Sequence, residues 1–168
     1  KGLTAHFGVK FLEDNKVGGQ VAFDPERDKG TTRHYGLEIR TARREVFGKI
    51  GYVFPSQEHK SIGLQLSTFR HKQNAYFGLR TYDAQQNNAY ANLIYQSRIG
   101  TDKHTFRTGL SMQYDQYAEV LQANHYARKE VVPGAFFEYT FRPLSKVDVV
   151  AGIREDHNNL YGWFTTPR

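Results

Sequence analysis

Histidine is the residue type in this chain that most readily does chemistry, because it binds metals and exchanges protons near neutral pH. The sequence contains seven histidines and no cysteine. They are His6, His34, His59, His71, His104, His125 and His157. No two of them pair at metal-ligand spacing, and the lack of cysteine excludes disulfides and thiolate sites. We therefore interpret the histidines as solvated residues and expect no metal site.

Other catalytic signatures are missing from the sequence. It has no glycine-rich phosphate loop followed by lysine and no Gly-x-Ser-x-Gly nucleophile elbow. Glu155 and Asp156 could bind a cation with Asn158 and Asn159, although ordinary solvated turn chemistry accounts for the same residues. We expect no catalytic residue and no cofactor, and therefore no enzyme.

The net charge of +6 raises the question of an anionic partner. Arg40, Arg43 and Arg44 lie near Tyr35 and Phe47, and RNA-binding surfaces use such mixtures of basic and aromatic residues. Arg40, however, alternates with apolar residues, and the charges are spread along the whole chain. We therefore expect no nucleic-acid partner and place the basic residues in loops and on the polar side of a sheet.

The dominant pattern is alternation of apolar and polar residues with period two, which is typical of β-strands. It starts at Leu3 and recurs along the chain. Seven strands are expected to end near Phe11, Phe54, Phe69, Ile99, Tyr117, Phe141 and Arg154, with an eighth beginning near Tyr161. The phase of the alternation changes between 35–40 and 49–54, which predicts a β-bulge or two separate segments across 41–46.

Alternation also predicts which residues share a face. One face should carry Leu3, Phe7, Leu64, Leu93, Leu110, Phe137 and Val149. The other should carry Lys10, Gln65, Arg98, Arg107, Glu138 and Arg154. The runs are about 9–11 residues long, as in tilted membrane strands, and none approaches the ~20 apolar residues of a spanning helix. The first face would then meet lipid and the second a polar lumen.

Short connections are expected to alternate with long ones. The short ones are 55–60, 100–103 and 143–146, and the long polar ones are 13–33, 70–88 and 116–129, with another beginning at 156–161. Outer-membrane barrels segregate short periplasmic turns from long outer loops in this way. We therefore predict an all-β fold, an antiparallel up-and-down transmembrane β-barrel in the bacterial outer membrane.

Several segments resemble the barrel of a known family. They are 129–139 (KEVVPGAFFEY), 149–154 (VVAGIR) and 158–168 (NNLYGWFTTPR), supported by 61–64, 76–80 and 92–97. These segments are similar to TonB-dependent outer-membrane receptors of Bacteroides-type bacteria, among which the vitamin B12 receptor-like group is nearest. The resemblance covers nearly the whole chain, but it is a pattern of strands and does not indicate a substrate.

The resemblance implies a barrel of about 22 strands closed by an N-terminal plug. A periplasmic TonB protein would pull on the plug to release a scarce nutrient such as cobalamin or an iron-siderophore. Residues 1–168 would be an internal fragment, about seven to eight strands of one β-barrel domain without the plug, and their sheet should be open. The expected partners are the nutrient, the lipid bilayer and TonB through the plug, with a surface lipoprotein as a further candidate.

Ligand specificity in such a receptor would come from the outer loops. The candidate contacts are Tyr82, Tyr117, His125, Tyr126 and Trp163, because aromatic and histidine side chains can stack on a macrocyclic or catecholate ligand. One alternative is a complete eight-stranded outer-membrane barrel with a structural or adhesion role, which would be expected to end in a strand with a terminal aromatic residue. A barrel enzyme would need a Ser or His constellation near one rim, and a lipocalin-like carrier would show similar alternation.

Overall fold

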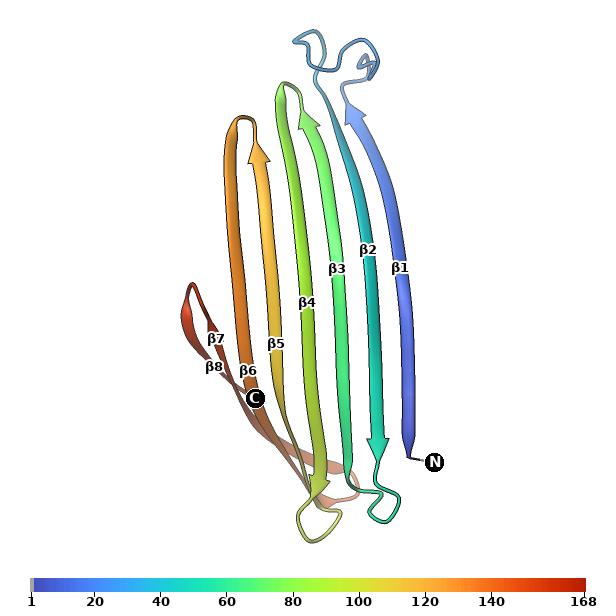
Figure 1. The fold of residues 1–168 in the computed structure, drawn as a ribbon, viewed down its shortest axis with the longest axis vertical. Helices are drawn as coiled ribbons and strands as arrows, with labels where there is room; N and C mark the ends of the chain where they lie inside the picture. Colours follow the sequence, from blue (N-terminus) through green and yellow to red (C-terminus); the bar gives the residue numbers. More distant parts are fainter. Residues whose placement is uncertain (1) are drawn as a thin grey trace.

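The structure, a computed structural model that describes residues 2–168, consists of β-strands joined by turns and one longer loop. The strands are β1 (Leu3–Gly19), β2 (Gly36–Val53), β3 (Ser61–Phe77), β4 (Arg80–Arg98), β5 (His104–Leu121), β6 (Asn124–Leu144), β7 (Val147–Asn158) and β8 (Gly162–Pro167). They form one antiparallel sheet in sequence order (Figure 1). The predicted all-β, up-and-down arrangement is confirmed. Residues 2–168 form no helix able to cross a bilayer.

The two faces of the sheet carry the residues that alternation predicted. Directly paired residues lie on the same face, and Leu93 pairs with both Leu64 and Leu110. The continuous register places Leu3, Phe7, Phe137 and Val149 on that side as well, which we call the belt face. The opposite side, the polar face, carries Lys10, Gln65, Arg98, Arg107, Glu138 and Arg154.

The strands are longer than predicted, and the prediction of long loops at 70–88 and 116–129 is wrong. The segment 70–77 continues β3 and 80–88 begins β4, while 116–121 continues β5 and 124–129 begins β6. The expected loop at 13–33 shrinks to 20–35, because β1 runs on to Gly19. These polar segments do not alternate in hydropathy, but their backbones still pair residue by residue with neighbouring strands.

Tight turns replace the loops that were expected at the upper end. Gly78 and Leu79 alone join β3 to β4, and Gln122 and Ala123 alone join β5 to β6. Gly78 has φ +61° and Gln122 has φ +57°, each at the first central position, where a type II′ hairpin turn needs a positive φ. The short connections predicted at 55–60 and 100–103 are found, and the one predicted at 143–146 is confined to 145–146 because β6 runs on to Leu144; all three lie at the opposite end of the sheet (Figure 1).

No β-bulge interrupts 41–46, and the prediction of one is wrong. β2 pairs without a break with β1 and β3 across this segment. The change of phase has a different origin, because Leu37 and Ile39 in the upper part of β2 point to the polar face, whereas Ile50 and Tyr52 point to the belt face. The register of the sheet shifts at another place, between Phe141 and Leu144 of β6.

The sheet is a single layer with little hydrophobic core. Among residues 2–168 only Ala75 and Tyr76 are buried hydrophobic residues, and no large side chain is fully buried. β1 and β8 pair with one strand each and not with each other, so the sheet is open, as expected. A sheet without a second layer leaves its apolar face and its two edges in need of a partner.

Candidate functional site

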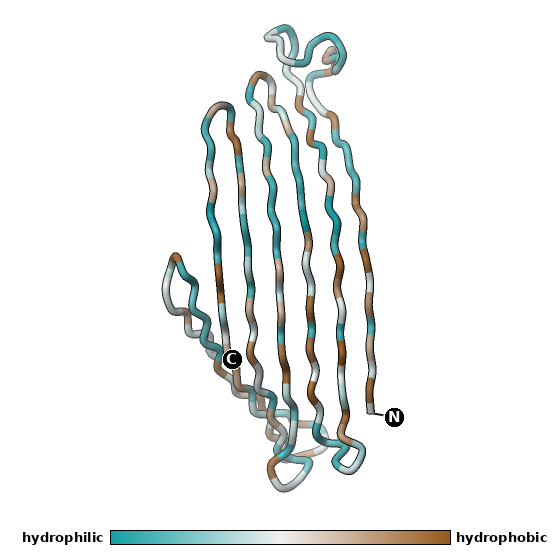
Figure 2. The backbone as a smooth tube through the Cα atoms, in the orientation of Figure 1, coloured by the Kyte–Doolittle hydropathy of each residue, from teal (hydrophilic) through white to brown (hydrophobic). Residues whose placement is uncertain are grey.

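An apolar belt covers the lower part of the belt face. On β5 it runs from Phe106 to Tyr114, and it continues on the strands on both sides (Figure 2). Its side chains are exposed, with fractions of 75% for Phe7 and 61% for Leu110. A stretch such as 106–114 spans roughly 30 Å along a strand at about 3.4 Å per residue. At the tilt of about 40° found in membrane barrels this becomes roughly 23 Å, close to the ~25 Å apolar band of such barrels.

Above the belt, the polar face carries a network centred on Asp115 of β5. This side chain is only 3% exposed and accepts hydrogen bonds from the amides of Gln86 (2.9 Å), Asn88 (2.9 Å) and Gln113 (2.6 Å). Burial by itself would raise the pKa of Asp115, but these hydrogen bonds outweigh it and lower the pKa. The carboxylate is therefore charged at neutral pH and fixes the side chains of β4 and β5 to each other.

Aromatic side chains extend this network upward. The Tyr82 hydroxyl donates a 2.6 Å hydrogen bond to Glu119, and the Gln86 amide donates a 3.0 Å hydrogen bond to the Tyr117 hydroxyl. The Arg128 guanidinium lies 4.1 Å from the centre of the Tyr117 ring, a cation–π geometry. We call these residues the polar wall: Tyr82, Gln86, Asn88, Gln113, Asp115, Tyr117, Glu119 and Arg128.

The polar wall can bind a ligand through two kinds of contact. The rings of Tyr82 and Tyr117 provide apolar surfaces with a polar tip. Glu119 and Arg128 provide opposite charges within the same part of the sheet. The carboxylate of Glu119 also raises the pKa of Tyr82, because the hydrogen bond holds the phenol proton. The wall can therefore receive a ligand that combines ring surfaces with hydrogen-bonding groups.

The five candidate ligand residues all lie in strands, so their expected position in loops is wrong. Tyr82, Tyr117 and Tyr126 share the polar face, whereas His125 lies on the belt face, one residue from Tyr126. Trp163 also lies on the belt face, on β8, where its ring packs 4.7 Å from that of His157. The structure thus brings together three of the five and separates the other two.

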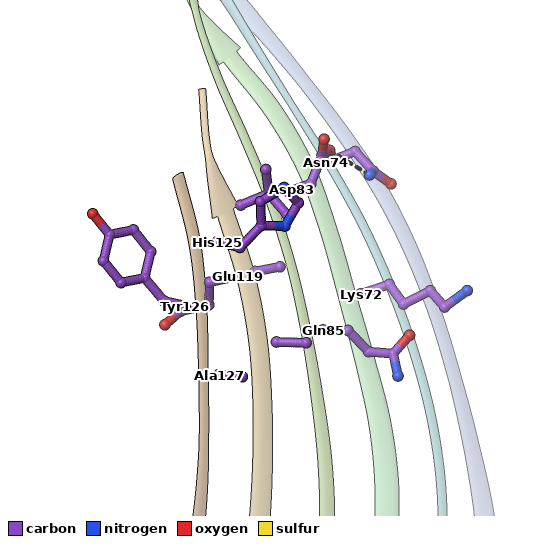
Figure 3. Close-up of a pocket in the computed structure, with 11 residues that line it drawn as sticks. Lys72, Asn74, Asp83, Gln85, Glu119, His125, Tyr126 and Ala127 are labelled. Carbon is purple, nitrogen blue, oxygen red and sulfur yellow. Dashed lines mark hydrogen bonds between the residues drawn. The ribbon is translucent and has the colours of Figure 1, made fainter. Parts of the chain in front are cut away.

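His125 instead lines a hollow of about 410 Å³ on the upper part of the belt face. Figure 3 shows His125 and Tyr126 pointing to opposite sides of the sheet. Asn74 donates a 2.6 Å hydrogen bond to Asp83 at this hollow, and Lys72 lies on the same face. The lining mixes polar side chains with small apolar ones and is open, so it differs from the apolar belt below it.

Sequence reasoning missed most of the polar wall. Gln86, Asn88 and Arg128 look like ordinary solvated residues of the predicted loops 70–88 and 116–129. The only local signal was Asp115 itself, which continues the alternation of 106–114 on the polar side. Its three amide partners come from two strands, so they become recognisable only through the register.

A second polar cluster lies lower on the polar face. Arg154 of β7 donates hydrogen bonds of 2.6 Å to both oxygens of Asp156 and a 2.7 Å hydrogen bond to Ser111 of β5. The two strands can meet across β6 because Gly134 lies between them. A Cβ at Gly134 would lie 2.0 Å from the Asp156 carboxylate oxygen. The cluster therefore depends on glycine at this position.

The candidate cation site at 155–159 is not formed. Glu155 lies on the belt face, where Thr165 donates to it, whereas Asp156 lies on the polar face with Arg154. Successive residues of a strand point to opposite sides, so the carboxylates of the adjacent Glu155 and Asp156 cannot converge on one ion. Both also lie within β7 and not in a turn. Within residues 2–168 no group of three His, Asp or Glu side chains is placed to hold a metal.

The loop 20–35 above β1 and β2 is organised around Asp28. Its side chain is 3% exposed, and it accepts hydrogen bonds from the backbone of Asp24 (3.0 Å) and from His34 (2.9 Å). These hydrogen bonds, the backbone one first, lower the pKa of Asp28 below its ordinary value. Lys29 attaches the loop to the sheet, with its amine 3.7 Å from the Glu38 carboxylate and 4.8 Å from the centre of the Tyr76 ring.

Comparison with known proteins gives no family assignment. No protein-family model matches the chain, and no curated protein matches it significantly.

Proposed function

We propose that the chain forms part of the wall of a bacterial outer-membrane β-barrel that takes up a scarce nutrient in a TonB-dependent manner. In this proposal the belt face meets the lipid, the polar face lines the lumen, and the turns at 55–60, 100–103 and 143–146 face the periplasm. The upper halves of the strands extend outside the membrane and carry the polar wall.

The observation that carries the membrane part is the exposure of the belt face. Phe7, Leu110 and Phe137 are 75%, 61% and 45% exposed on one side of a sheet that has no second layer. Exposed apolar surface of this extent is stable against lipid and unstable in water. The two free edges support a larger barrel, because lipid does not tolerate unpaired strand edges and further strands would satisfy them.

The nutrient part is supported by the polar wall and by the resemblance of the sequence. Tyr82, Tyr117 and Arg128 offer stacking and hydrogen-bonding groups above the belt. A ligand such as cobalamin or an iron-siderophore combines flat apolar surfaces with many polar atoms. Energy for its release would come from TonB acting on a plug, and a surface lipoprotein is a candidate partner.

A pair of neighbouring positions tests the membrane part. The chain contains no cysteine, so a single cysteine can be placed at Leu93 on the belt face or at Asn92 on the polar face. With the intact protein in vesicles, a fluorophore at Leu93→Cys should be quenched by brominated lipid and protected from aqueous iodide. The same fluorophore at Asn92→Cys should show the reverse. Equal quenching by lipid at both positions would overturn the proposal.

A second experiment tests the uptake part. Replacement of Tyr82, Tyr117 and Tyr126, the three candidates that share the polar face, by Ala in the intact receptor should weaken binding of its nutrient, with cobalamin and ferric siderophores as the first probes. The barrel strands should still insert in the membrane. Unchanged binding would remove these residues as ligand contacts.

The alternative is a complete eight-stranded barrel with a structural or adhesion role. It is favoured by one observation, since eight strands is also the number in the smallest membrane barrels. It requires β1 to pair with β8. Cysteines placed at Val9 and Thr165, and then at neighbouring registers, should form a disulfide in membranes if the sheet closes on itself. Their failure to do so at every register would exclude this alternative.

A further inference from the structure

A row that includes three basic residues borders the belt on its upper side. Directly paired positions across β1 to β6 form one register row of Phe11, Arg44, Arg70, Asn87, Gln116 and Lys129. The next row down on the same face is Val9, Val46, Thr68, Ala89, Tyr114 and Val131. From one row to the next, the belt face thus changes from mostly apolar side chains to polar and basic ones.

Arg44 and Arg70 stand directly opposite each other in this row. Like charges in directly paired positions destabilise a sheet. Arg70 donates a 2.8 Å hydrogen bond to the neutral amide of Gln85. Within residues 2–168 neither arginine has a carboxylate oxygen within 4.0 Å, although Glu13 lies diagonally from Arg44 on the edge strand. Both side chains are exposed, so an external anion can reach them.

An apolar hollow of about 450 Å³ lies directly below these arginines. Its floor consists of small residues in two adjacent rows, Gly48 and Ala91 in one and Thr68 and Ala89 in the other. Larger side chains of the belt, among them Phe7, line its sides. The hollow can therefore receive a flexible hydrocarbon chain that lies along the sheet.

We propose that this surface binds a phosphate-bearing lipid of the outer leaflet, with the phosphate between Arg44 and Arg70 and an acyl chain in the hollow. The proposal rests on the membrane location proposed above. Guanidinium groups bind phosphate through paired hydrogen bonds, and an anion between the two arginines offsets their mutual repulsion. Because the arginine row and the hollow adjoin, a single molecule that carries both an anionic group and a hydrocarbon chain can occupy both.

The experiment compares two lipid probes. The intact protein is reconstituted in phosphatidylcholine vesicles that contain traces of spin-labelled phosphatidic acid or spin-labelled phosphatidylcholine. The immobilised fraction of each probe, measured by electron paramagnetic resonance, gives its relative association constant. The phosphatidic acid probe should be preferred, and R44Q/R70Q should lower that preference about ten-fold or more, because each basic residue near a lipid surface contributes about five-fold.

Two matched controls separate the effects. R107Q/R142Q removes the same charge from the polar face and should leave the preference unchanged. Ala91→Phe fills the hollow and should reduce association of the phosphatidic acid probe. Ala135→Phe, on the same face but outside the hollow, should not.

The outcomes distinguish failure of the membrane location from failure of the lipid site. Immobilisation of neither probe would overturn the membrane location and the lipid site together. Immobilisation without a preference, or with a preference that survives R44Q/R70Q, would overturn the lipid site alone. Displacement of the probe by inorganic phosphate at an equal concentration would also overturn it, because the arginines would then recognise free phosphate without the hydrocarbon chain.

Discussion

The lower and upper halves of the same strands differ in how polar and apolar side chains are distributed over the two faces. In β5 the lower residues 106–114 place apolar side chains on one face, whereas the upper residues 115–121 mix polar and apolar side chains on both faces. Figure 2 shows this division across the sheet. The backbone ladder is continuous through both halves, so hydrogen bonding alone does not distinguish them.

The two halves differ in the contacts that their side chains make. The lower half exposes apolar groups such as Leu110, which the proposed membrane location places against lipid. The upper half holds its strands together through side-chain hydrogen bonds, such as those from Gln86 and Asn88 to Asp115. In the proposed membrane location, each strand would pass from lipid to water without a break while its side-chain partners change at the boundary. The predictions below test this division.

The largest effect is expected from a charge in the middle of the belt. Leu110→Arg should lower the free energy of unfolding of the intact protein in lipid vesicles by about 2–4 kcal/mol. Ala118→Arg lies on the same face and strand but in the upper half, and should change it by less than about 0.5 kcal/mol. Gln113→Arg on the polar face should also cost little, because the Asp115 carboxylate lies beside it. Denaturant titration in lipid measures all three, and equal costs would abolish the division.

The next effect concerns the network of the upper half. Asp115→Ala removes the acceptor of three amide groups and should cost about 1–3 kcal/mol. Gln116→Ala, the neighbouring residue on the belt face, should cost much less. The same titration applies, with hydrogen exchange of β4 and β5 as a local probe. If Asp115→Ala were neutral, the upper strands would be held by backbone pairing alone.

A smaller effect is expected at Tyr82. Tyr82→Phe removes its hydrogen bond to Glu119 and should cost about 0.5–1.5 kcal/mol. Because Glu119 raises the pKa of Tyr82, this phenol should ionise at higher pH than ordinary tyrosines. Ultraviolet titration of Glu119→Gln should show one tyrosine shifted to lower pH. An identical titration curve would mean that the pair is not formed.

The smallest and most local effect concerns the loop above the upper half. The pKa of Asp28 is lowered below 3.8 in the folded state, so its contribution is present above pH 3.8 and is lost as pH falls through the lower folded value. Hydrogen exchange of 20–35, corrected for intrinsic rates, should therefore increase in acid while the belt stays protected. Asp28→Asn should show fast exchange already at neutral pH, and Glu26→Gln should not. Uniform acid sensitivity of loop and belt would contradict this.

Alternation by itself determined the fold class and the two faces. Leu93 and Arg98 are assigned to opposite faces by counting along one strand, because the side-chain period of a strand is two wherever the strand is regular. The short turn before β7 was also predicted, since Pro143, Ser145 and Lys146 interrupt the alternation. The open sheet was expected as well, because seven or eight strands are barely enough for the smallest closed barrel.

Only the tertiary structure decided how far the strands extend and which side chains meet. The segments 70–88 and 116–129 carry polar side chains on both faces, so hydropathy there does not distinguish a strand from a loop. Their pairing depends on neighbouring strands and on turns such as Gly78-Leu79. The polar wall and the pairing of Arg44 with Arg70 likewise bring together residues that are distant in sequence. Both depend on the register, which is a property of two paired strands and not of one segment.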